Sequence, residues 1–190
     1  MKNVKQKKRK KMNVELLRRE VNLIKDEALR NKVEAILQNI PEVMEHKPSS
    51  SSGKYHPDFD RIDGGNINHT KAVVKVAEKL VDGFSSWDYA LHSINADHIY
   101  AACILHDMCK YGTDPDDTDH TVHEHPKLAG DLIRADYPHV AFLIDSHMGK
   151  WNTSRYSNVV LPVPVTFMQK IVHIADCIAA QKWISDKILD

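Results

Sequence analysis

The chain of 190 residues is 42% hydrophobic and carries 26 basic and 26 acidic side chains, a composition that predicts a globular protein and argues against wholesale disorder. Its longest uninterrupted apolar run, residues 100–105, is far shorter than the roughly 20 residues of a membrane-spanning helix, and no apolar stretch of a secretory signal follows the basic N-terminus. The three cysteines lack CxxC spacing and favour a reducing, cytoplasmic setting over a disulfide framework.

The balanced charge hides an uneven distribution. Residues 1–47 carry 13 Lys/Arg against 7 Asp/Glu, whereas residues 48–190 carry 13 against 19. None of the 12 histidines precedes His46, and eleven lie in the second part. We therefore expect a basic arm with an amphipathic helix over residues 1–47, followed by a histidine-rich domain over residues 48–190.

The N-terminal arm begins with seven Lys/Arg among residues 2–11, which should be solvated when alone. Apolar residues then recur at spacings of three and four, which predicts one amphipathic helix over residues 14–40 that ends before Pro41. Three interpretations stay open: contact with nucleic acid, a homodimer through the helix, or a plain solvated terminus. Membrane-surface binding is disfavoured because the apolar face lacks Trp and Phe anchors.

Residues 48–68 are rich in Ser, Gly and Pro and are predicted to form one long loop. This loop is either a flexible linker or a substrate loop in which Lys54 and His56 contact a phosphate. In the second case the two side chains would supply charge and hydrogen bonds near the catalytic site.

The remaining chain shows helical periodicity and no convincing period-two alternation, which predicts an all-α fold. We expect a helix from residue 69 to near Gly83 and a second helix capped by Asn95. Two more open at Pro126 and Pro138, and a last long helix runs through Trp183. A polar loop over residues 114–119 is expected to be solvated and acidic.

Six ionisable residues lie on or beside these apolar helical stripes, so the fold should aim them inward. They are His69, His106, Asp107, His125, His147 and Asp176. Burying such groups is costly unless a strong compensator is present, and a divalent metal is the strongest one. Imidazole and carboxylate ligands together suit several metals, so the sequence predicts a metal site whose ion could be Mn, Fe, Ni, Co, Zn or Mg.

His106 and Asp107 are adjacent, so their side chains diverge by about 100° on a helix. At a helix end, Asp107 could offer one oxygen to each of two ions. His69, His106 and Asp176 would then complete one site, while His125 and His147 complete the other. Two ions roughly 3.5–4 Å apart suit the in-line attack of water on phosphorus, so two ions are expected.

This series resembles the HD-domain superfamily of metal-dependent phosphohydrolases, over about residues 50–185. HDMCK (residues 106–110) is similar to the HDxxK motif of that family, and HPKLAG (residues 125–130) is similar to its helix start. The resemblance implies an α-helical bundle, phosphoester hydrolysis, the six metal ligands, and a catalytic role for Asp107 and for Lys110 near the substrate phosphate. The His125 and His147 pair is typical of binuclear phosphodiesterases.

Local similarity to HD-domain 3′→5′ exoribonucleases appears in GKYHP, GGNINHT and SHMGKW. Those enzymes carry an OB-type domain ahead of the HD domain, whereas this chain has the basic helix. No GYP follows His147, which disfavours cyclic dinucleotides. The expected substrate is a nucleotide, cyclic nucleotide or short oligonucleotide, cleaved at a phosphodiester in preference to a monoester. The alternatives are an exoribonuclease-like nuclease and a module that binds nucleotide or RNA without hydrolysis.

Four further residues are interpreted less directly. His123 is a rival to His125, which is preferred because it directly precedes Pro126. His173 lies three residues before Asp176 and would either support the metal ligands or face solvent. Lys150 could bind a phosphate and Trp151 could stack a base, or the Trp could simply anchor its loop.

Overall fold

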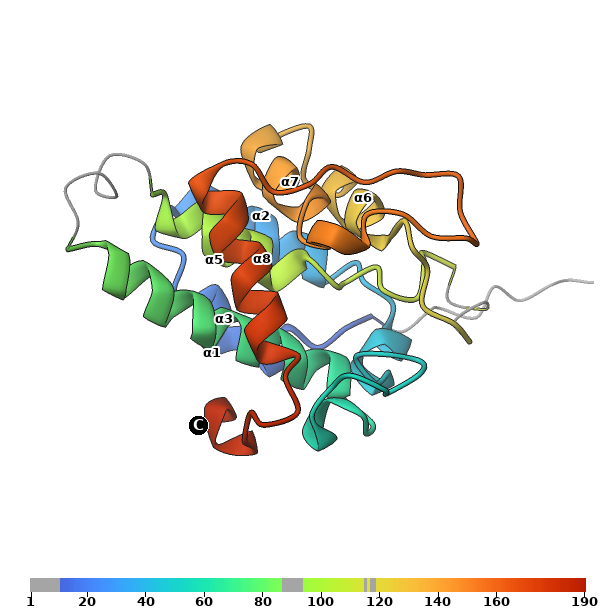
Figure 1. Ribbon diagram of the computed structural model, residues 1–190. Helices are drawn as coiled ribbons and strands as arrows, with labels where there is room; N and C mark the ends of the chain where they lie inside the picture. Colours follow the sequence, from blue (N-terminus) through green and yellow to red (C-terminus); the bar gives the residue numbers. More distant parts are fainter. Residues whose placement is uncertain (1–10, 87–93, 115, 117–118) are drawn as a thin grey trace, which may run out of the picture.

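The computed structural model describes residues 11–86, 94–114, 116 and 119–190, and within these ranges it is built from helices with no β-strand. The predicted all-α fold is therefore confirmed. Short 3-10 helices are interspersed among the α-helices along the described chain (Figure 1). The α-helices are α1 (Arg18–Val21), α2 (Glu27–Leu37), α3 (Gly65–Phe84), α5 (Ala96–Leu105), α6 (His125–Asp131), α7 (Pro138–Asp145) and α8 (Phe167–Ala179).

The long helix α3 organises the bundle because it packs against both α5 and α8. Figure 1 shows α8 crossing α3, with α6 and α7 side by side at one end of the bundle. The face of α3 toward the core carries Val73, Val74 and Ala77, each with no exposed surface. Helix α5 is buried along most of its length, so the residues at its C-terminus are delivered to the centre of the protein.

The predicted single helix over residues 14–40 is wrong. The structure has a 3-10 turn (Val14–Leu17), then α1, a break after Val21, and α2. The break is stabilised by two carboxylates. Asp26 accepts a hydrogen bond from the amide of Leu29 and so begins α2, while Asp97 accepts from the amides of residues 25 and 26. The apolar spacing continues across the break, since Val21 and Ile24 are both fully buried.

These N-terminal helices belong to the same apolar core as the later ones. Leu17, Leu29 and Leu37 are fully buried in one cluster with residues of α3, α5, α7 and α8, and both α1 and α2 pack against α5. The division of the chain at residue 47 stays a prediction. The basic segment before Lys11 lies outside the described residues.

Several predicted helix boundaries are confirmed. Asn95 caps α5 by accepting a hydrogen bond from the amide of His98, and Pro138 opens α7.

Two other boundaries differ from the prediction. The last helix ends at Ala179 rather than near Trp183, whose side chain is 73% exposed. Helix α6 begins at His125, one residue before the predicted start at Pro126, with Glu124 in the N-cap position. None of the described helices is long and apolar enough to cross a membrane.

The segment from Lys47 to Gly64 is attached to the bundle by its backbone. The amide of Ser49 donates to the carbonyl of Asp60, and the amide of Asn66 donates to that of Lys47. The hydroxyl of Tyr111, just beyond α5, donates to the carbonyl of Pro48. The predicted loop over residues 48–68 is therefore too long. It contains a 3-10 turn over residues 58–60 that packs against α3, and α3 begins at Gly65 rather than at residue 69.

Candidate metal centre

The six predicted ligands come from five separate parts of the fold and meet at one point. His69 lies in the first turns of α3, His106 and Asp107 follow α5, and Asp176 lies in α8. His125 begins α6, and His147 follows α7 by two residues. The side chains of His69, His106, Asp107 and His147 are fully buried, and that of His125 is 2% exposed.

One half of the cluster gathers around Asp176. Its Oδ1 atom lies 3.0 Å from Nε2 of His69 and 4.0 Å from Nε2 of His106. Asp107 faces the same half with Oδ2, which lies 3.9 Å from Nε2 of His69 and 3.5 Å from Nε2 of His106. These four residues therefore converge as the sequence predicted for the first site.

The other half of the cluster uses the second oxygen of Asp107. Oδ1 lies 3.1 Å from Nε2 of His125 and 3.6 Å from Nε2 of His147, and the two Nε2 atoms are 3.2 Å apart. His69 with His106 and Asp107, and Asp107 with His125 and His147, each form a compact group of potential ligand atoms. Asp107 thus lies between the two groups with one oxygen toward each.

Hydrogen bonds at the far side of the imidazole rings fix which nitrogen faces inward. The Nδ1 atoms of His106, His125 and His147 lie 2.7, 2.7 and 2.8 Å from backbone carbonyl oxygens. A carbonyl oxygen can only accept, so each Nδ1 carries a proton, and each ring turns its Nε2 atom toward the cluster, where it can act as a metal ligand. A ring nitrogen held in this way is the usual arrangement for a metal ligand.

The inward atoms lack the partners that buried polar atoms normally have. Nε2 of His106 and Oδ1 of Asp107 have no hydrogen-bond partner among the residues that the structure describes. The Nε2 atoms of His125 and His147 face one another at 3.2 Å. A divalent cation in each half of the cluster would satisfy these atoms, so the donor set fits metal.

Electrostatics within the cluster keep His106, His147 and Asp107 in ligand-competent forms. Burial, together with the neighbouring rings of His106 and His125, lowers the pKa of His147 to about 3, and burial also lowers the pKa of His106. Burial alone would raise the pKa of Asp107, but the Lys110 ammonium and His106 hold it well below its usual value. Nζ of Lys110 lies 2.6 Å from Oδ2 of Asp107.

His69 behaves differently because it lies between two carboxylates. Burial lowers its pKa, but hydrogen bonds to Asp176 and Asp60 outweigh burial and raise the pKa to about 10. In this arrangement Nε2 contacts Asp176 and Nδ1 contacts Asp60. A metal ion at Nε2 would replace the proton that faces Asp176.

A cavity of about 740 Å³ opens beside this cluster. Lys110 and His125 line it on the side of the metal ligands. The lining also includes Ser51 from the segment before α3 and residues of the loop that follows α7. The cavity therefore gives a small molecule a route to the second half of the cluster.

The predicted substrate residues fall into two groups. His56 lies beside the metal ligands, with its ring centroid 5.1 Å from that of His69. Lys54, Lys150 and Trp151 do not line the cavity. Nζ of Lys150 lies over the ring of Trp151 at 4.7 Å, and Lys54 lies similarly over Tyr55. Roles for these four residues in substrate binding stay predictions.

The structure separates the rival histidines. His125 contacts Asp107, whereas His123 lines the cavity with its Nε2 atom buried and unpartnered within the described chain. His173 donates from Nδ1 to the carbonyl of His147 at 2.7 Å, so it supports the backbone of a predicted ligand. Gly149 allows this contact, because a Cβ there would lie 2.2 Å from Cε1 of His173.

Sequence reasoning missed Asp60 and Asn66. Asp60 is fully buried and contacts Nδ1 of His69 at 3.0 Å, and Asn66 donates to the carbonyl of Asp107 at 3.3 Å. Asp60 lies in an irregular segment where no periodicity marks an inward residue. Asn66 lies about one helical turn before His69 on α3, and this spacing could have identified Asn66 from the sequence.

Comparisons with known proteins agree with this geometry. The profile of the family described as HD domain matches residues 66–181. The chain is 32% identical over 172 residues to the "Dihydroneopterin 2′,3′-cyclic phosphate phosphodiesterase" of Methanocaldococcus jannaschii; the alignment covers 80% of this chain and 63% of that relative. No solved structure gives a significant match. The predicted relationship is thus confirmed, and the chain belongs to the HD domain family.

Proposed function

We propose that this protein is a metal-dependent phosphohydrolase that cleaves a phosphodiester bond in a small nucleotide-like molecule. One observation carries the proposal: the two oxygens of Asp107 face two separate sets of imidazole Nε2 atoms, at 3.1 to 3.9 Å. A pair of divalent ions sharing one carboxylate is an arrangement suited to phosphoester hydrolysis. Membership of the HD domain family supports the same reaction class.

The residues of the cluster have distinct proposed roles. His69, His106 and Asp176 would hold one ion, His125 and His147 the other, and Asp107 both. Bound divalent ions supply Lewis acidity, which activates water and neutralises charge on a phosphoryl group. Lys110 reaches the cavity wall while its ammonium contacts Asp107, so it can place positive charge where negative charge develops on the phosphoryl oxygens.

We propose a cyclic phosphodiester as the substrate class, with a ring such as a nucleobase or a pterin attached. The relative from Methanocaldococcus jannaschii is named for a 2′,3′-cyclic phosphate, and the chain spans 63% of its length. The cavity of about 740 Å³ lies within the range of roughly 300–1,000 Å³ that is usual for small-molecule sites. Both facts favour a compact substrate over a long strand.

Hydrolysis of a defined panel tests this proposal. Protein loaded with Mn²⁺ or Fe²⁺ is incubated with nucleoside 2′,3′-cyclic phosphates, dihydroneopterin 2′,3′-cyclic phosphate, 3′,5′-cyclic nucleotides, phosphomonoesters and short RNA, and products are followed by ³¹P NMR. We expect ring opening of a 2′,3′-cyclic phosphate. Asp107→Asn should lose this activity, while Asp119→Asn on the exposed acidic loop should retain it.

Two other outcomes would contradict the proposal. Stepwise shortening of RNA from the 3′ end, without ring opening, would favour the exoribonuclease-like alternative. Tight binding of nucleotides without product, in protein with its metals bound, would favour the non-hydrolytic module.

We also propose, from charge alone, that the basic residues before Lys11 contact nucleic acid. Removing residues 1–10 should then weaken RNA binding and flatten its salt dependence. A homodimer is a separate proposal from the sequence, and sedimentation of the full chain as a monomer would contradict it.

A further inference from the structure

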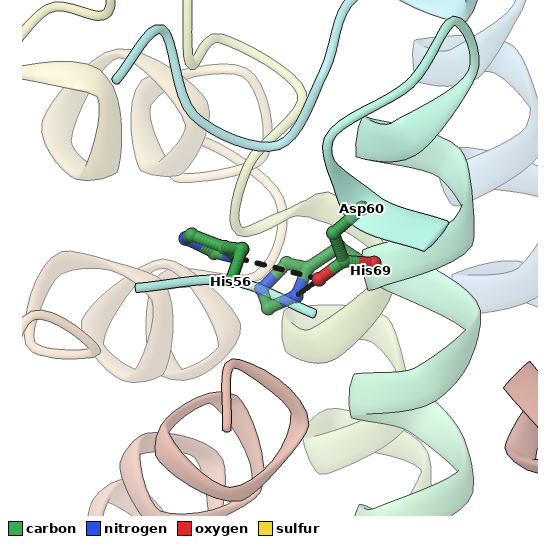
Figure 2. A group of neighbouring side chains, drawn as sticks. All are labelled: His56, Asp60 and His69. Carbon is green, nitrogen blue, oxygen red and sulfur yellow. Dashed lines mark hydrogen bonds and ion pairs between the residues drawn. The ribbon is translucent and has the colours of Figure 1, made fainter. Parts of the chain in front are cut away.

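Asp60 occupies an unusual position next to the metal ligands. Its side chain is fully buried, and Oδ2 lies 3.0 Å from Nδ1 of His69 and 3.3 Å from Nδ1 of His56 (Figure 2). Among the described residues, these two imidazoles are its only ion-pair partners, and Oδ1 has no hydrogen-bond partner. Burying a carboxylate with no Lys or Arg beside it is costly, so the position calls for an explanation.

The backbone around Asp60 is held firmly in place. Its carbonyl accepts a hydrogen bond from the amide of Ser49 at 2.8 Å, and its amide donates to the carbonyl of Pro57. Gly65, at the start of α3, approaches so closely that a Cβ there would lie 2.0 Å from the carbonyl oxygen of Asp60. The carboxylate is therefore aimed at His69 by packing on both sides of the turn.

The contact with His69 determines which ring nitrogen is available to a metal. A carboxylate that accepts from Nδ1 keeps the proton on that nitrogen and leaves Nε2 free to face Asp107 and Asp176. His106, His125 and His147 use backbone carbonyls for this purpose. Among these four histidines, His69 alone uses a carboxylate, whose negative charge makes the ring a stronger ligand.

We propose that Asp60 is a positioning residue for the metal centre, which fixes His69 with Nε2 toward the ion and joins it to the segment carrying His56. The proposal rests on the proposed metal centre and adds a residue to it. The same Oδ2 atom accepts from His56, whose Nδ1 also lies 3.3 Å from the hydroxyl of Ser49. Asp60 therefore links the segment before α3 to the first half of the cluster.

A third ion bound by His56, Asp60 and His69 is the competing explanation, because their ligand atoms lie within 4.8 Å of one another. It would require His69 to bind metals through both nitrogens and therefore to lose both of its ring protons. A hydrogen bond from a singly protonated ring needs no such step. The geometry thus favours the positioning role.

Metal affinity measured without substrate tests the proposal apart from catalysis. Zn²⁺ is titrated in competition with a chromophoric chelator into wild-type protein, Asp60→Asn, Asp60→Ala and the control Asp58→Asn. Asp58 lies on the same 3-10 turn with a fully exposed side chain. We expect one class of site to weaken by about 10–100-fold in Asp60→Ala, less in Asp60→Asn, and not at all in the control. The class that contains His125 and His147 should keep its affinity.

A spectroscopic measurement distinguishes positioning from general support of the fold. Long-range ¹H–¹⁵N correlations of zinc-loaded protein, with His69 assigned through His69→Gln, should show a proton on Nδ1 shifted strongly downfield. This signal should move upfield in Asp60→Asn and be lost in Asp60→Ala, while the other ligand histidines keep theirs. His56→Gln should leave both the signal and the zinc affinity nearly unchanged.

Several results would overturn the proposal. Asp60→Ala with wild-type zinc affinity would do so, as would loss of both classes of site together with the helical circular dichroism. Three zinc ions in wild-type protein, one of them lost in His56→Gln, would establish the third site instead. Failure of all cyclic phosphates as substrates would count against the proposed function but leave the role of Asp60 standing.

Discussion

Lys110 and Asp107 form the closest contact between a cation and the predicted metal ligands, at 2.6 Å. The sequence placed Lys110 one turn beyond Asp107, and the structure shows the two side chains in contact. Their proximity means that Lys110 either completes the charge balance of the ligands or acts on a substrate at the cavity wall. Removing the ammonium would cause loss of bound metal if Lys110 has the first role, and loss of catalytic rate if it has the second.

We predict that Lys110→Met lowers kcat by about 100–1,000-fold, the usual cost of removing one group that stabilises transition-state charge, while metal content is unchanged. Steady-state kinetics and metal analysis of the same preparation would measure both quantities. Loss of the metals together with the activity would show that Lys110 instead supports the ligands.

Protonation of His69 gives a second prediction at this scale. The pKa of His69 is about 10 in the metal-free protein, above the ordinary 6.5, so protonation of His69 stabilises the folded metal-free protein. This stabilisation is fully present below pH 6.5 and is lost as pH rises through 10. Metal binding must displace the proton that faces Asp176, so affinity should fall as pH falls. Calorimetric zinc titrations at pH 8, in buffers of different ionisation enthalpy, should show about one proton released per His69 site. No release would contradict this account.

Four of the proposed ligands were recognisable from the sequence, whereas Asp60 was not. His69, His106, Asp107 and Asp176 stood out because each is an ionisable residue on or beside an apolar helical stripe, and all four meet in the structure. No sequence pattern identifies Asp60, because its position depends on turns and hydrogen bonds and not on a repeating spacing of apolar residues.

At the scale of elements, the turn after α7 shows how local backbone conformation supports the cluster. Gly149 adopts φ of +56°, in the left-handed region, and lies against the ring of His173. That ring in turn donates to the carbonyl of His147. A side chain at residue 149 would push His173 away and disturb the backbone that holds a predicted ligand.

We predict that Gly149→Ala weakens metal binding at the half of the cluster formed by His125 and His147, and lowers the melting temperature. The matched control is Gly83→Ala near the end of α3, where a Cβ meets no atom within 4 Å. That change should stabilise the helix by about 0.5–1 kcal/mol. Zinc titration and thermal unfolding measure both effects; equal behaviour of the two variants would contradict the argument.

Helix boundaries were predictable where a capping residue and a change of pattern coincided, as at Asn95 and Pro138. The break after α1 was not predictable from periodicity, because buried residues continue on both sides of it. Asp26, which caps α2, and Asp97, which also stabilises the break, lie 71 residues apart in the chain. Contacts of that separation depend on the folded arrangement of α2 and α5.

At the scale of the whole molecule, one apolar core joins the helices on both sides of residue 47 and surrounds a polar centre. The formal charge of zero is the sum of a basic N-terminal part and an acidic remainder. Two divalent ions would add four positive charges at the centre of that acidic part. Burying these ligand atoms costs free energy of folding, and bound metal would offset that cost.

Removal of metal should accordingly destabilise the whole protein. We predict a lower melting temperature after chelation, and recovery when Mn²⁺ or Zn²⁺ is restored. An ion at 100 times its dissociation constant stabilises the folded state by about 2.7 kcal/mol. Differential scanning calorimetry with a chelator, with the metal restored, and with His147→Gln provides the test. A melting temperature that is insensitive to metal in wild-type protein would contradict a filled buried site.

The number of ions bound per chain tests whether Asp107 joins two metal sites. Wild-type protein and Asp107→Asn, loaded with metal and dialysed together, are compared by elemental analysis, with Asp119→Asn as the exposed control. A carboxylate that faces both sets of histidines with separate oxygens predicts two ions in wild-type protein and in the control, and at most one in Asp107→Asn. A single ion in wild-type protein, or two ions retained without the Asp107 carboxylate, would contradict it.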